Sequence, residues 1–259
     1  MKKKIIAVLL IVALLSAGCG SVEDGEMISS ELSGITEESE TEENTQTVSV
    51  EEEITNQPYE VEMVEFRKDE LCNISYPQIS GWENEEKQQE WNVIFEKCAE
   101  EAVQDMEEDD SVDMSFTIEE QTEDFLSMSV SYYYDFKSAA HPSAAMKSFN
   151  INMKTGEKVT FADMADPKET AGLLFNGTEG YCILGVDELT MQDILSYNFI
   201  WMEPTEEALE SSLSHFDGEV EEYGEDETMG YSFRRNGKVC LIFYVNHAMG
   251  DYAVVQLEG

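Results

Sequence analysis

The sequence predicts an α+β fold, with antiparallel sheets packed against helices and one long amphipathic helix in the first half of the folded part. Residues 112–119 and 126–136 alternate apolar and polar side chains, which is the period of strands. Residues 85–106 place apolar side chains at helical spacing instead. Apolar strands return at 239–245 and 252–257. Strands on both sides of inserted helices are typical of the α+β class.

The two alternating runs predict a hairpin. In the first, the apolar residues are Val112, Met114, Phe116 and Ile118. In the second, one face is apolar and aromatic, and the other carries Ser127, Ser129, Ser131, Tyr133 and Asp135. We therefore expect each strand to have one face on the core and one face in water.

The amphipathic helix is expected to present one apolar side to the sheet. The residues on that side are Trp91, Ile94, Phe95, Cys98, Ala102 and Met106, with acids and amides opposite.

Further elements follow the hairpin. Residues 146–153 and 158–161 flank a short turn in which Gly156 suits a left-handed conformation. Helices are expected at 187–197 and at 205–216, the second with Thr205 as its N-cap.

The N-terminus predicts export and lipidation. Three lysines precede an apolar run, and Leu15-Ser16-Ala17-Gly18-Cys19 resembles the bacterial lipoprotein box. We expect residues 1–18 to be a signal peptide and Cys19 to carry lipid that anchors the chain to the outer face of the cell membrane. An ordinary signal peptide with an unrelated cysteine is the alternative. Residues 19–58 are acidic, without lysine or arginine, and predict a disordered tether before the domain at 59–259. A further boundary near 161–180 is left open.

The charge is strongly negative, with a formal net charge of −41. Such a surface repels nucleic acid and attracts cationic proteins, peptides or metal ions. Solubility in a cation-rich cell wall is the alternative explanation.

Known catalytic and cofactor motifs are missing from the sequence. It has no Gly-x-Ser-x-Gly, His-Glu-x-x-His, phosphate-loop or dinucleotide pattern. His141, His215 and His247 lack the spacing of metal ligands, so we expect no metal site, no cofactor and no enzyme activity. The remaining cysteines either form bridges in one of three pairings or stay as buried free thiols, which we favour: Cys72, Cys98, Cys182 and Cys240.

Several segments carry a family resemblance. They are "ISYPQISG" (74–81), "SAAHP" (138–142), "KSFNINMKTGEKVTFADM" (147–164) and "FYVNHAMGDYAVVQL" (243–257). Their order resembles extracellular domains of unknown function shared by the sigma-V anti-sigma factor, a lysozyme receptor, and the non-catalytic region of peptidoglycan deacetylases. The resemblance implies a related fold and a wall-facing context.

The segment "FKSAAHPSAAMKSF" (136–149) holds the candidate site. Pro142 disfavours helical geometry at His141, so this histidine is either a structural corner of a loop or a ligand contact. Tyr133 and Asp135 lead into the loop and complete the candidate binding residues. We expect a non-catalytic surface lipoprotein that binds a wall glycan or a cationic protein such as lysozyme. An unrecognised polysaccharide hydrolase and a structural envelope lipoprotein are the alternatives.

Overall fold

The computed structural model describes residues 58–177, 179–185, 188–199, 203–218 and 230–258. All of them belong to one compact unit, Glu53–Gly259. The predicted signal peptide, the lipidation site Cys19 and all but the last residue of the predicted tether lie outside the described residues. Among the helices in the described ranges, none has the length and apolar character needed to span a membrane.

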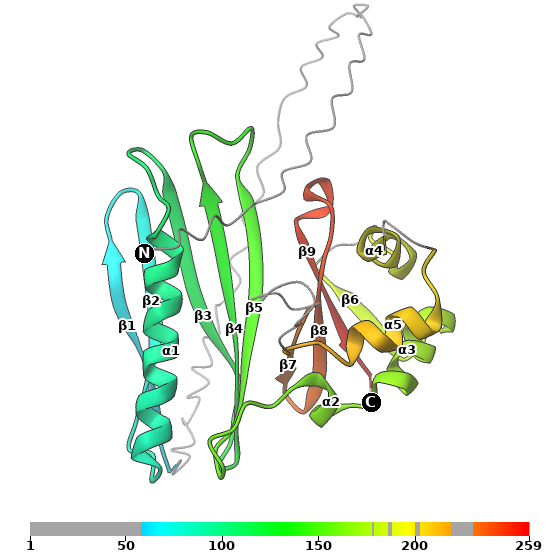
Figure 1. Cartoon of the computed structure of the whole chain (residues 1–259), viewed down its shortest axis with the longest axis horizontal. Helices are drawn as coiled ribbons and strands as arrows, with labels where there is room; N and C mark the ends of the chain where they lie inside the picture. The colour runs from blue at the N-terminus through cyan, green and yellow to red at the C-terminus, as the bar shows by residue number, and fades with distance from the viewer. Residues whose placement is uncertain (1–57, 178, 186–187, 200–202, 219–229, 259) are drawn as a thin grey trace, which may run out of the picture. The chain divides into compact units, whose positions relative to one another are not determined.

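The first half of the unit forms a sheet in the order β1-β2-β3-β4-β5 (Figure 1). Its strands are β1 (Glu60–Lys68), β2 (Cys72–Ser80), β3 (Ser111–Gln121), β4 (Phe125–Asp135) and β5 (Ser143–Asn152). Neighbouring strands are antiparallel except β2 and β3, which pair in parallel and are joined by helix α1 (Glu85–Val103). The hairpin of β3 and β4 matches the alternation in the sequence.

Helix α1 covers one face of this sheet. Asn84 caps its N-terminus by accepting a hydrogen bond from the backbone N–H of Lys87. Its buried residues are Trp91, Phe95, Ala99 and Ala102. Ile94, expected on the buried side, is 37% exposed, because the row through Trp91 and Phe95 faces the sheet and leaves Ile94 at its margin.

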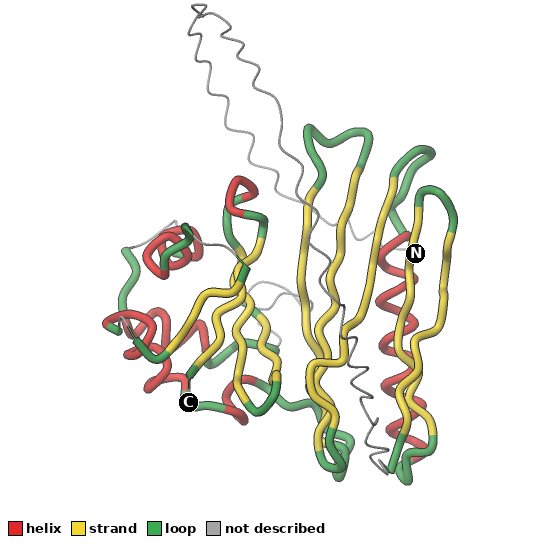
Figure 2. Tube along the Cα trace, turned by 180° about the vertical axis from the view of Figure 1, so that it is seen from behind, coloured by secondary structure: helices red, strands yellow, loops and turns green. Residues whose placement is uncertain are grey.

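The second half forms an antiparallel sheet in the order β6-β9-β8-β7. Its strands are β6 (Tyr181–Leu184), β7 (Tyr231–Arg235), β8 (Lys238–Tyr244) and β9 (Tyr252–Leu257). The helices of this half are α2 (Phe161–Met164), α3 (Pro167–Asn176), α4 (Met191–Asn198), α5 (Glu206–Leu213) and the 3-10 turn η1 (His247–Met249). Figure 2 shows both groups of strands and helices from behind.

Three apolar clusters hold these layers together. The first lies between α1 and the first sheet, around Phe95, Met128 and Ile151. The second lies between helices α3 to α5 and the second sheet, around Leu209 and Phe243. The third is small and includes Met146, Phe233, Cys240 and Ile242, from β5, β7 and β8. The chain therefore has the predicted α+β architecture.

The face of β4 that was expected to lie in water is only partly exposed to solvent. Ser131 is half-buried and Tyr133 is exposed, but Ser127 and Ser129 are buried. The reason is that β7 packs against this part of the face and supplies polar partners, including the backbone N–H of Arg234, which donates to Ser127 Oγ (2.8 Å).

Other expectations differ in detail. Residues 158–161 do not form a strand: a single bridge joins Lys158 to Ile151, and α2 begins at Phe161. Helix α3 was not predicted from the sequence; its N-cap Asp166 accepts hydrogen bonds from two backbone N–H groups. Thr205 caps α5 as expected, although that helix ends at Leu213.

Candidate functional site

The predicted binding residues lie at the C-terminal end of β4 and in the loop that follows it. Tyr133 is 48% exposed and lies opposite Ala144 of β5. Asp135 is half-buried and ends the strand, opposite Ser111. His141 is exposed in the loop to β5.

The loop that carries His141 is fixed at its start. Asp110, which is almost fully buried, accepts hydrogen bonds from the backbone N–H of Glu107 and of Lys137, both at 2.8 Å. Through these bonds, the acidic turn before β3 fixes the start of the β4–β5 loop. The two backbone N–H groups satisfy the buried carboxylate of Asp110, so their presence explains its burial without a bound ion.

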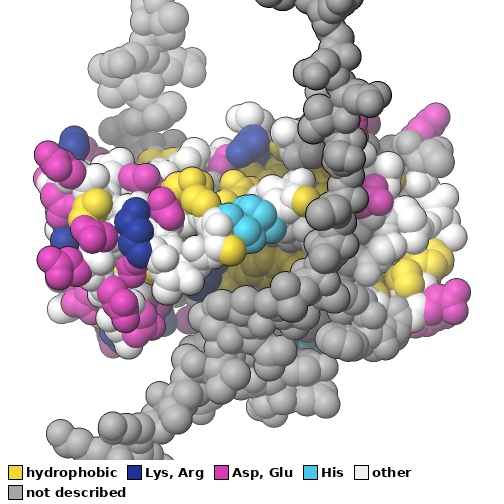
Figure 3. Space-filling model, turned by 90° about the horizontal axis from the view of Figure 1, so that it is seen from above, with side chains coloured by type: hydrophobic (Ala, Val, Ile, Leu, Met, Phe, Trp, Pro, Cys, Tyr) yellow, Lys and Arg dark blue, Asp and Glu magenta, His cyan; other side chains and the backbone are white. Residues whose placement is uncertain are grey.

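The fold brings His141 onto His247. The two imidazole rings stack with centroids 3.7 Å apart and planes within 10° of parallel. Both side chains are exposed, and Figure 3 shows histidine in cyan at the surface of the view from above. This pair could not be predicted from the sequence, because the contact joins two loops from different sheets.

A tight loop between β8 and β9 positions His247. Asn246 caps η1 by accepting from the backbone N–H of Ala248 (2.9 Å). Gly250 and Asp251 both have positive φ angles, 101° and 71°, which turn the chain back toward β9. Asp251 therefore returns to the side of His247.

Asp251 links this loop to the first sheet. Its carboxylate lies 3.0 Å from Nδ1 of His247 and also accepts the backbone N–H of Ala144 at 2.8 Å. An ionised carboxylate only accepts hydrogen bonds, so Nδ1 of His247 carries a proton, and in a neutral ring the lone pair is then on Nε2. Nδ1 of His141 is 3.2 Å from the carbonyl oxygen of Pro142, which assigns the same tautomer there.

His247 and Asp251 have the arrangement of a general base, but in the described part of the chain neither histidine forms a hydrogen bond to a nucleophile. Within the described ranges, neither His141 nor His247 hydrogen-bonds to a serine, threonine or cysteine side chain. Among the same residues, no group of three or more histidine, cysteine, aspartate or glutamate side chains could hold a metal ion.

A second surface feature is a pair of adjacent hollows beside the start of α1, of about 730 and 520 Å³. They share Trp82, Glu83 and Glu85. The larger also has Glu96, and neither lysine nor arginine lines it. The smaller contains Lys154, which forms an ion pair with Asp124.

The wall of the larger hollow is held by hydrogen bonds. Because β3 pairs with only the first residues of β2, the later part of β2 needs other partners. The amide of Asn92 supplies them, accepting from the N–H of Ile79 (2.8 Å) and donating to its carbonyl (2.9 Å). Gln88 accepts the N–H of Trp82 at 3.0 Å. This wall is therefore pre-formed.

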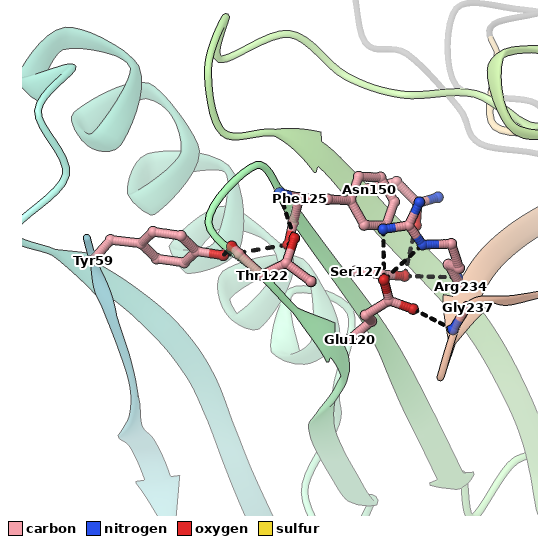
Figure 4. Close-up of polar contacts among 8 residues, drawn as sticks. All are labelled: Tyr59, Glu120, Thr122, Phe125, Ser127, Asn150, Arg234 and Gly237. Carbon is pink, nitrogen blue, oxygen red and sulfur yellow. Dashed lines mark hydrogen bonds and ion pairs between the residues drawn. The ribbon is translucent and has the colours of Figure 1, made fainter. Parts of the chain in front are cut away.

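An extensive polar network lies between the sheets and was not predicted from the sequence. Ser127 Oγ donates to Asn150 Oδ1 (2.7 Å), and Asn150 donates to the carbonyl of Ser232 on β7 (2.7 Å). At one end of β7, Arg234 pairs with Glu120, and the N–H of Gly237 also donates to Glu120 (2.7 Å; Figure 4).

The same interface buries two carboxylates. Glu119, whose side chain is 3% exposed, accepts from Ser129 Oγ (2.6 Å) and from Arg235 Nε (2.6 Å) and Nη2 (2.9 Å). Asp217 is 1% exposed and accepts from the N–H of Ser232 (2.8 Å) and from its hydroxyl. Burial raises the pKa of Asp217 to about 6, although the hydrogen bonds from Ser232 act in the opposite direction. These bonds satisfy groups that would otherwise destabilise the interface.

The four described cysteines are free thiols, which is the alternative favoured from the sequence. Cys72 and Cys240 are buried, whereas Cys98 and Cys182 are half-buried. Burial raises the pKa of Cys98 and that of Cys240 to about 11, so neither is a reactive thiolate near neutral pH.

No family model matches the chain, and no curated protein sequence matches it. Among solved structures, it is similar to a DUF3298 family protein from Pseudomonas aeruginosa PAO1, with a TM-score of 0.31 and 17% identity over 46% of this chain and 68% of that one. It is also similar to a DUF3298 family member from Bacteroides fragilis NCTC 9343, with a TM-score of 0.41 and 13% identity over 78% of this chain and 90% of that one. The structural neighbours thus contain a domain of unknown function, and the link to the sigma-V anti-sigma factor and to deacetylases stays a prediction.

Proposed function

We propose that this chain is a non-catalytic lipoprotein, anchored through Cys19 to the outer face of the cell membrane, whose acidic α+β domain binds a cationic protein. Lysozyme is the concrete candidate, because the sequence motifs resemble those of a lysozyme receptor. A cell-wall glycan is the other class of ligand that the resemblance implies.

The acidic hollow beside α1 is the observation that supports this proposal. Glu83, Glu85 and Glu96 line it, and its other polar side chains are uncharged amides. A lysine or arginine entering this space meets carboxylates that no lysine or arginine of the lining neutralises. The formal net charge of −41 adds a longer-range attraction that raises the rate of encounter with a basic protein.

Pre-organisation makes the hollow a better site than the acidic surface in general. Gln88 and Asn92, which line it, are already held by backbone groups of Trp82 and Ile79. A partner therefore binds without first ordering these side chains, and the entropic cost of association is smaller.

The test is the affinity of the purified full chain for lysozyme at two salt concentrations. We expect binding at low salt that weakens as salt screens the charges. The variant Glu83→Gln/Glu85→Gln/Glu96→Gln should weaken it by about tenfold or more, which corresponds to about 1.4 kcal/mol.

A matched control separates this site from the overall charge. The variant Glu60→Gln/Glu62→Gln/Glu65→Gln removes the same number of charges from three exposed residues of β1. If both variants weaken binding equally, the hollow is not the site. If the unaltered chain does not bind lysozyme even at low salt, lysozyme is not the ligand.

One observation favours a second candidate, a hydrolase acting on peptidoglycan. His247 with Asp251 on Nδ1 has the arrangement of a general base oriented by a carboxylate. Turnover of purified wall fragments that disappears in both His141→Ala and His247→Ala would favour the hydrolase over the binding protein. A structural lipoprotein would show neither binding nor turnover.

A further inference from the structure

Strand β1 leaves one edge of the first sheet open. It stands at the end of the strand order and pairs with β2 on one side (Figure 1). On its other side, no strand within the described ranges pairs with it. The unpaired backbone N–H and C=O groups of such an edge are a template for one further strand.

The apolar side chains of this edge strand are exposed as well. Met63 is 42% exposed, Val64 37% and Phe66 36%. Met63 and Val64 are neighbours in the strand, so their side chains point to opposite faces of the sheet. Helix α1 packs mainly on β2 and β3, and β1 extends beyond its cover. The strand therefore carries apolar surface on both faces that a further strand would help to bury.

The charges of β1 are distributed unevenly along the strand. Glu60 and Glu62 lie at its start, Glu65 lies past its middle, and Arg67 and Lys68 form its end. All five residues are exposed. If two such strands run antiparallel, the acidic start of each lies opposite the basic end of the other, whereas parallel strands would place like charges together. The edge of β1 is thus complementary to a second copy of itself.

We propose that two copies of this chain form a dimer by antiparallel pairing of their β1 strands about a two-fold axis. Glu60 and Glu62 of each copy then face Arg67 and Lys68 of the other. A two-fold contact uses the same edge of both copies and occupies both, so association stops at the dimer.

Two features keep this dimer weak. The formal net charge of −41 repels a second copy at long range. A β-bulge between Glu65 and Arg67 interrupts the ladder with β2 and increases the local twist. We therefore expect a reversible equilibrium between monomer and dimer.

The test is sedimentation equilibrium of the purified full chain at about 0.15 M salt, where the Debye length is about 8 Å and long-range repulsion is screened. The unaltered chain should form dimers at concentrations of up to about 100 µM.

Two charge variants test the antiparallel arrangement. Glu60→Lys/Glu62→Lys makes β1 basic at both ends, and Arg67→Glu/Lys68→Glu makes it acidic at both ends. Each should weaken self-association by about tenfold or more, because like charges then face one another. An equal mixture of the two should form a heterodimer.

A matched control separates the edge from the net charge. Glu107→Lys/Glu108→Lys makes the chain less negative by the same amount, at two exposed residues outside β1. It should associate at least as well as the unaltered chain, whereas Glu60→Lys/Glu62→Lys should associate less.

Zero-length cross-linking of the unaltered chain with a carbodiimide decides without any variant. Within one extended strand, Lys68 lies about 20 Å or more from Glu60 and Glu62, so an amide bond between them forms only between two copies. We expect this link in the dimer.

The proposal is overturned if the unaltered chain stays monomeric, which is also the result expected if a peptide or another protein occupies the edge. A dimer without the link between Lys68 and Glu60 or Glu62 would also overturn it. So would self-association that persists in both charge variants, since association through another part of the chain would persist in the same way.

Discussion

The buried carboxylate of Asp217 makes the stability of the domain depend on pH in a defined direction. Its pKa is raised from 3.8 to about 6, mainly because burial disfavours the charged form. The folded state therefore binds a proton more tightly than the unfolded state does. Ionised Asp217 destabilises the fold above pH 6, and this cost decreases as the pH falls through 6 toward 3.8.

The magnitude follows from the two pKa values. A difference between 3.8 and about 6 corresponds to about 3 kcal/mol if the pH is taken below both values. The sequence pI is about 4.1, and the chain carries little net charge near that pH, which limits unfolding measurements at low pH. Between pH 7.5 and pH 5, we expect roughly 1 kcal/mol of added stability from this residue.

The assay is urea unfolding at several pH values, followed by the fluorescence of Trp82 and Trp91, which are both buried. Other carboxylates also repel one another less as the pH falls, so the comparison is with Asp217→Asn. Asparagine keeps the size of the side chain and tolerates the positive φ of 61° at this position.

The difference in unfolding free energy between the two chains should change by roughly 1 kcal/mol from pH 7.5 to pH 5, in favour of the unaltered chain at the lower pH. A difference that stays constant over this range would refute the assignment of a raised pKa to Asp217.

Two further predictions concern stability measured by the same unfolding assay. Arg235→Ala should cost about 2–3 kcal/mol, because it leaves Glu119 buried without its cation. Arg67→Ala removes an exposed pair and should change the stability much less; equal costs would contradict a buried role for Glu119. Gly156→Ala should cost more than the roughly 1–2 kcal/mol expected for Gly237→Ala. Both glycines have φ near +77°, but a Cβ at Gly156 would lie 2.3 Å from Cγ of Lys87, while Gly237 has open space. A smaller loss of stability at Gly156 would show that the Lys87 side chain moves away freely.

The sequence predicts elements better than it predicts what they contact. Periodicity located the β3–β4 hairpin, α5 with its cap Thr205, and β9, because burial of one face repeats at the period of the element. The same reasoning placed Ile94 on the buried side of α1, where the structure has it at the margin. A helix has a wide apolar side, and only the packed sheet decides which of its rows is central.

The sequence predicted one part of the candidate site but not the other. The proline after His141 indicated a non-helical loop, and Tyr133 proved exposed. His247 and Asp251 could not be placed with them, because the contact between the loops depends on how two sheets pack. The positive φ at Asp251 brings its carboxylate to the backbone N–H of Ala144, and no local sequence pattern predicts this contact.

The buried serines of β4 show that a polar strand face is not always exposed to solvent. A face of small polar residues can also meet a second polar surface, provided each group finds a partner. Here Ser127 and Asn150 bond to backbone groups of β7, and Ser232 of β7 bonds to Asp217. A one-residue shift of β7 would break all of these bonds at once, whereas apolar contacts would tolerate it better. The polar interface therefore fixes the register between the two sheets, and with it the approach of the loops that hold His141 and His247.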